Sequence, residues 1–194
     1  MLRALRRLWE GYAASIPKSE VVDSVPESQW GRADLLPTVS KAKRQAFTSL
    51  LALVYSHLTP LEAEALVKRG ADAFTRADEA DSALREALLP EETDGVSKSL
   101  GFIACDWKAA EEVEWQANLL CQAHGISERW SAPPGDLPRV LQSFDLWLSH
   151  HERRLLCFSD GDTLVAFALR EDQVASAIAL GKKLKLAIEN LGEA

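Results

Sequence analysis

The sequence predicts an α+β protein, in which a helical N-terminal half is followed by a small, mostly antiparallel sheet packed with helices. Apolar residues recur at helical spacing between residues 38 and 90, whereas short apolar runs typical of strands occur only after residue 98. A length of 194 residues is close to that of one ordinary domain. We therefore expect the helical region, 38–90, and the α+β region, 98–190, to form one compact unit.

Residues 1–14 carry leucines at helical spacing, with Arg3, Arg6 and Arg7 on the opposite side, and predict a short amphipathic helix. A helix docked on the domain, or a mobile arm, is favoured over contact of residues 1–12 with an anionic membrane, because three basic residues alone give weak adhesion. Three prolines then predict an irregular linker over residues 15–37.

The helical region begins with an apolar face that includes Phe47, Leu50 and Val54. Thr59, followed by a proline and by Glu62, forms the pattern of a capping box and predicts the start of a second helix. Gly70 is expected to end that helix. A third helix is expected to stop before Pro90, because proline cannot continue a helix.

The α+β region begins with a buried strand at residues 100–105, and a helix is expected to run from Asp106, as its cap, to His124. A short strand at Trp130 and a helix after the turn at residues 133–136 follow. Two strands, 155–158 and 163–169, are expected to form a hairpin around Asp160 and Gly161. A final helix is predicted over residues 174–186.

The charge, the apolar runs and the cysteines of the sequence limit which classes of function the protein can have. The net charge is −7, and residues 91–194 hold the whole excess, with 10 Lys and Arg against 17 Asp and Glu. This balance argues against a nucleic-acid partner, which requires clustered basic residues, and favours a basic protein partner. No apolar run reaches the ~20 residues of a membrane span. Three cysteines in apolar segments are typical of reduced thiols, so a cytoplasmic location is expected.

No motif for catalysis, for a cofactor or for a metal is present in the sequence, so no catalytic residue, cofactor or metal site is predicted. The weak candidates for a polar site are single residues: Asp106 at the end of the first strand, His124 at the end of a helix, and Asp160 and Asp162 in the hairpin turn. Each has a sufficient structural explanation as a cap, as a helix end or as a turn residue.

Four of the six tryptophans lie within residues 107–147, interleaved with acidic residues. For the cluster as a whole, packing at the edge of a core is favoured over a contact surface, because tryptophan usually contributes to packing. Trp115 is the exception, since helical spacing places it at the border of the buried face of its helix. Its neighbours there are polar, so the predicted interaction surface consists of Trp115, Glu111, Glu114 and Asn118.

The segments Ile103-Ala-Cys-Asp-Trp-Lys108, Glu111-Glu-Val-Glu-Trp115 and Phe158-Ser-Asp-Gly-Asp-Thr-Leu164 resemble small uncharacterised bacterial proteins that are grouped as a domain of unknown function. The resemblance covers about residues 100–190 and leaves the helical half unmatched. It implies a bacterial cytoplasmic setting and assigns no site residues.

Two functional hypotheses follow. The favoured one is a non-enzymatic, acidic protein of adaptor or immunity type, whose tryptophan and carboxylate surface binds a protein partner, possibly a basic one. The alternative is a small hydrolase or metal-dependent enzyme that uses Asp106, Glu111 and a histidine. The sequence leaves the oligomeric state open.

Overall fold

The computed structural model describes residues 39–76, 80–88, 101–160 and 162–191. The chain divides into two compact units, residues 1–37 and 38–194, and every described residue belongs to the second. The amphipathic helix predicted for residues 1–14 and the linker predicted for residues 15–37 lie outside the described residues.

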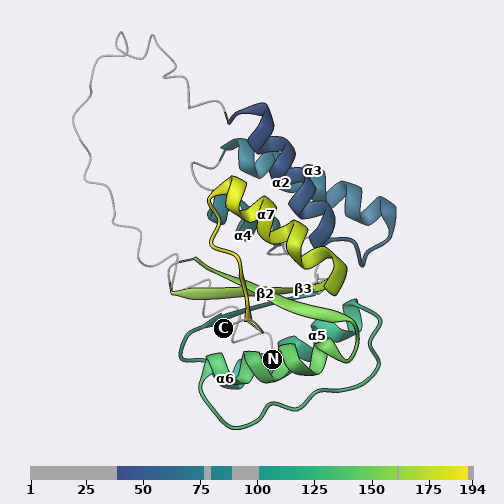
Figure 1. The fold of residues 1–194 in the computed structure, drawn as a ribbon, viewed down its shortest axis with the longest axis vertical. Coiled ribbons are helices and arrows are strands. Elements are labelled where there is room, and N and C mark those ends of the chain that lie inside the picture. Colours follow the sequence, from purple (N-terminus) through teal and green to yellow (C-terminus); the bar gives the residue numbers. More distant parts are fainter. Residues whose placement is uncertain (1–38, 77–79, 89–100, 161, 192–194) are drawn as a thin grey trace, which may run out of the picture. The chain divides into compact units, whose positions relative to one another are not determined.

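Helices dominate the first part of the described chain and the sheet follows, which confirms the predicted α+β class (Figure 1). All strand pairs in the described sheet are antiparallel, and their order is β1-β3-β2-β4. The described α-helices are α2 (Lys41–Val54), α3 (Pro60–Arg76), α4 (Ala80–Leu88), α5 (Val113–Ala123), α6 (Leu137–Ser149) and α7 (Val174–Leu184), and the strands are β1 (Phe102–Asp106), β2 (Arg153–Asp160), β3 (Thr163–Arg170) and β4 (Glu189–Asn190).

The sheet lies between two layers of helices. Helices α2, α3, α4 and α7 cover one face, whereas α5 and α6 cover the other (Figure 1). Successive side chains of a strand point to opposite faces, so the central strand β3 contributes to both cores. Val165 and Phe167 pack with the four-helix layer, and Ala166 packs with α5 and α6. This burial on both faces explains why β3 is an almost continuous apolar run in the sequence.

The predicted capping box is present at the start of α3. The Glu62 amide donates to Thr59 Oγ1 at 3.4 Å, and the Thr59 amide donates to Glu62 Oε2 at 3.3 Å. The prediction that Gly70 ends this helix is wrong, because α3 continues to Arg76. Gly70 instead allows close packing: a Cβ there would collide with Leu51 Cδ1 and would lie 2.9 Å from Ala87 Cβ.

Other elements also differ from the predictions, beyond small shifts in the ends of β1 and β2. The helix expected from Asp106 begins later, with a 3-10 helix at Ala110–Glu112 that leads into α5. Trp130 lies outside any strand. Helix α7 ends at Leu184 rather than near residue 186, because Lys185 takes a left-handed conformation and the chain turns back to form β4. The hairpin of β2 and β3 is confirmed, with Asp160 paired to Thr163.

No helix in the described ranges has both the length and the apolar character needed to cross a membrane.

Candidate functional site

The 3-10 helix after β1 and the first half of α5 carry the predicted interaction surface. Asp106 ends β1, and its Oδ1 atom accepts a hydrogen bond of 2.8 Å from the Lys108 amide. The Asp106 carbonyl also accepts from the Ala109 amide at 2.9 Å. Asp106 therefore stabilises the turn after the strand and does not cap α5 itself.

The four clustered tryptophans separate into two groups. Trp130 is buried, with its ring centroid 4.9 Å from that of Phe144, and the half-buried Trp147 lies 6.0 Å from the same phenylalanine. Trp115 and Trp107 keep 47% and 45% of their surface exposed, although Val113 and Ala117 on the same helix as Trp115 are buried. Large apolar side chains with this exposure are candidates for a contact surface.

Two of the predicted surface residues also bind the chain's own backbone. Glu114 Oε2 accepts from the Ala132 amide at 3.0 Å. Asn118 donates to the Trp130 carbonyl at 2.9 Å and accepts from the Trp130 amide at 3.1 Å, which holds the segment after α5 against that helix. Trp115 and Glu111 are exposed, and no such bond involves their side chains among the described contacts.

The weak polar candidates lie at two opposite ends of the sheet. Asp106 and Asp160 both pair with Thr163, so the strand register places them at the same end, next to Asp162. His124 lies beside Gly101, at the start of β1. Five strand residues separate these ends by about 16 Å.

The other histidines also lie at the Gly101 end. His57 lies beside Gly101, whereas only Glu152 separates His150 and His151 from the start of β2. Strands β1 and β2 are both antiparallel to β3 and thus parallel to each other, so both begin at the same end. Asp106 therefore has no histidine near it, and the described residues contain no group of three or more His, Cys, Asp or Glu arranged to hold a metal ion.

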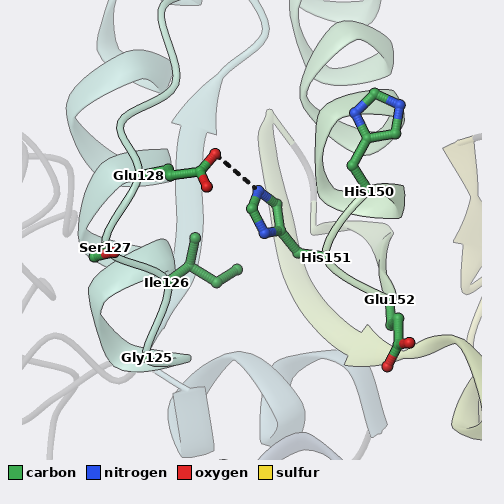
Figure 2. Close-up of a pocket in the computed structure, with 7 residues that line it drawn as sticks. All are labelled: Gly125, Ile126, Ser127, Glu128, His150, His151 and Glu152. Atoms are coloured by element: carbon green, nitrogen blue, oxygen red, sulfur yellow. Dashed lines mark ion pairs between the residues drawn. The ribbon is translucent and has the colours of Figure 1, made fainter.

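A polar pocket of about 370 Å³ opens at the Gly101 end, where α5 and α6 both terminate (Figure 2). His151 Nε2 lies 3.7 Å from Glu128 Oε2, and the ring of His151 contacts the ring of Trp147 at a centroid distance of 4.4 Å. The lining residues are Gly125, Ile126, Ser127, Glu128, His150, His151 and Glu152.

The pocket contains a serine, a histidine and a glutamate, which are the residue types of a hydrolase triad. The geometry does not suit that chemistry, because the Ser127 side chain points away from His151 (Figure 2). Glu128 reaches the imidazole, and the two side chains form an ion pair when His151 is protonated. Nothing in the sequence relates the adjacent histidines to residues 125–128, so no sequence pattern indicates this pocket.

The three cysteines are free and buried. Burial, supported by the nearby carboxylates of Glu112 and Asp106, raises the pKa of the Cys105 thiol to about 12. Burial also raises the pKa of Cys121 and Cys157 to about 11 each. Because the thiolate is the nucleophilic form, these thiols are unsuited to catalysis at neutral pH.

A family model described as "Domain of unknown function (DUF6630)" matches residues 41–192, so the match includes the helical half as well as the α+β region. No curated protein and no solved structure shows significant similarity to the chain.

Proposed function

Since the chain belongs to the DUF6630 family, whose description names no activity, we propose a function from the site alone: a non-enzymatic protein of adaptor or immunity type that binds a basic protein partner. The observation that carries this proposal is the exposure of Trp115, which keeps 47% of its surface open on an acidic segment. Tryptophan is enriched among the residues that contribute most to protein interfaces.

The negative charge around Trp115 indicates which kind of partner this surface binds. Residues 106–115 contain four carboxylates, Asp106, Glu111, Glu112 and Glu114, against the single basic residue Lys108. A partner that offers lysine or arginine beside an apolar pocket for the indole complements this surface. Nucleic acid does not complement it, because phosphates would be repelled.

The proposed setting is the bacterial cytoplasm. The resemblance of residues 103–115 and 158–164 to small bacterial proteins supports the bacterial origin. The three unlinked, buried thiols suit a reducing compartment. The hydrolase alternative gains no support, because the histidines and Asp106 lie at opposite ends of the sheet.

Affinity capture of the full chain from its native cells, with quantitative mass spectrometry, tests the proposal. Trp115→Ala is expected to reduce recovery of a basic partner about 30-fold, the effect of losing an interface residue worth 2 kcal/mol. Glu111→Lys should weaken recovery as well, and raised salt should reduce wild-type binding because salt screens exposed charges.

Matched controls lie on α3, in the other helical layer. Leu61 is 79% exposed, and Glu64 is exposed, so Leu61→Ala and Glu64→Lys make comparable changes away from the proposed surface. Both control variants should retain the partner. The proposal is wrong if folded Trp115→Ala and Glu111→Lys variants recover every protein that the wild type recovers.

A further inference from the structure

Two histidine rings lie in a tilted contact at the Gly101 end of the sheet. His57 lies in the turn after α2, and His124 is the residue that caps the C-terminus of α5. Their ring centroids are 4.2 Å apart, with 31° between the ring planes. Because α2 and α5 cover opposite faces of the sheet, this contact joins the two helical layers beside the edge strand β1.

Gly101 makes room for both rings. A Cβ at this position would lie 3.3 Å from His57 Nε2, 3.6 Å from His124 Cδ2 and 3.0 Å from Ala123 Cβ. The backbone φ of +75° at Gly101 also disfavours any other residue. The imidazoles are therefore held in a tight contact.

The surroundings of His124 favour its neutral form. Within the part of the chain that the structure describes, both of its ring nitrogens are buried without a hydrogen-bond partner, and so is Nε of Arg153. His57 Nδ1 lies 3.0 Å from the Val54 carbonyl, which can only accept, so this nitrogen carries a hydrogen and donates it. The titratable groups whose charges affect His124 are His57, from the turn after α2, and Arg153, from β2, and both are bases.

We propose that the contact of His57 with His124 is an acid-sensitive latch, which holds the C-terminal end of α5 to the turn after α2 while His124 is neutral. Protonation of His124 would place a buried cation between two basic groups, and opening of the contact would let water solvate that charge. Burial, with His57 and Arg153 as further causes, lowers the pKa of His124 from 6.5 to about 3, in agreement with this geometry.

The lowered pKa of His124 determines how the stability of the latch changes with pH. The open or unfolded state binds a proton more readily than the latched state, so the contribution of His124 to stability is complete above pH 6.5 and declines below it. Each pH unit below 6.5 reduces the latched-to-open ratio about ten-fold, which gives about a hundred-fold at pH 4.5.

Urea unfolding of the full chain between pH 8 and pH 4.5 measures this effect. His124→Phe keeps an aromatic ring for the contact but removes the ionisable nitrogens. Between pH 8 and pH 4.5, the folding equilibrium constant of this variant should therefore fall about a hundred-fold less than that of the wild type. His150→Phe is the matched control, because His150 is exposed, and it should keep the wild-type pH dependence.

Two measurements on the wild type keep the test independent of the variant's folding. NMR titration should show that the latched His124 stays neutral to pH 4.5. Hydrogen exchange at pH 5 should show early loss of protection at the amides of residues 124–126, which bond to the last turn of α5. A normal His124 titration near pH 6.5 in the folded protein, or protection at 124–126 that is lost only on global unfolding, would overturn the proposal, as would a folded His124→Phe variant with the wild-type pH dependence.

Discussion

At the scale of single residues, two buried polar side chains bind the backbone of the sheet. Gln116, which is 7% exposed, accepts from the Ala104 amide at 2.8 Å and donates to the Ala104 carbonyl at 3.0 Å. Asp145, which is 2% exposed, accepts from the Leu155 amide at 2.7 Å and pairs with Arg154 at 2.7 Å. Each side chain supplies hydrogen bonds to a strand that lacks a full neighbour, since β1 is an edge strand and β4 pairs with only two residues of β2.

Replacement of Gln116 by leucine should destabilise the fold, because the amide and the carbonyl of Ala104 would lose their hydrogen-bond partner beneath α5. Each unsatisfied group costs about 1–3 kcal/mol, so Gln116→Leu, which leaves two of them, is expected to lower the free energy of unfolding by about 2–6 kcal/mol. Gln122→Leu, at an exposed position of the same helix, should change it by less than about 0.5 kcal/mol. Urea unfolding compares the two variants, and equal midpoints would contradict the assigned role of Gln116.

At the scale of secondary-structure elements, the end of α7 stores backbone strain. Lys185 caps this helix with φ +63° and ψ +25°, a left-handed conformation that an L-residue adopts at a cost. This left-handed conformation allows the Leu186 amide to donate a hydrogen bond of 2.9 Å to the Gly181 carbonyl, and it directs the chain toward β4. Glycine is the usual residue at such a position.

Lys185→Gly is therefore expected to raise the free energy of unfolding by about 1 kcal/mol, because relief of strain exceeds the entropy that glycine adds to the unfolded state. Lys183→Gly makes the same chemical change inside the helix and should lower it by about 1 kcal/mol. Chemical denaturation of both variants measures the two shifts. Shifts of the same sign would show that the conformation of Lys185 carries no strain.

The elements that the sequence predicted well are those with local causes. Thr59 and Glu62 predict the start of α3 because both partners of the capping box lie within one turn. The prediction for Gly70 is wrong because this glycine allows close packing against α2 and α4, which lie elsewhere in the sequence. Strand β4 has two residues, which are too few to show the alternation of apolar and polar residues that predicts a strand. Its pairing with β2 depends on the fold as a whole.

The candidate site shows the same division between local and distant causes. Trp115 was placed at the border of its helix by spacing alone, and it is half exposed in the structure. Gln116 was overlooked, although its position three residues after the buried Val113 placed it on the inner face. The contact of His57 with His124 joins residues far apart in the sequence, so no local pattern could indicate it.

At the scale of the whole molecule, the central strands link the two cores. Leu156 and Phe158 of β2 pack with the four-helix layer, whereas Leu155 and Cys157 pack with α5 and α6. Strand β3 alternates in the same way. Disorder in one core would expose the strands that form the other, so residues 38–194 are expected to unfold in one cooperative transition.

Tryptophan fluorescence can test this cooperativity, because all tryptophans in the described ranges belong to the part of the chain between β1 and β2. Trp9 and Trp30, which lie outside those ranges, would be replaced by phenylalanine so that fluorescence reports the α5 and α6 side alone. Leu50 is fully buried in the opposite core. Leu50→Ala should lower the free energy of unfolding by about 2–5 kcal/mol through the cavity that it leaves.

In a single cooperative unit, the fluorescence midpoint and the midpoint from far-UV circular dichroism should shift together. Leu141→Ala, in the core beneath α6, serves as the matched control and should move both signals in the same way. If Leu50→Ala moved only the circular dichroism signal, the helical layer would be unfolding before the rest. The acid-sensitive latch between His57 and His124 would then join two separately stable parts, whereas coincident shifts place it inside one cooperative structure.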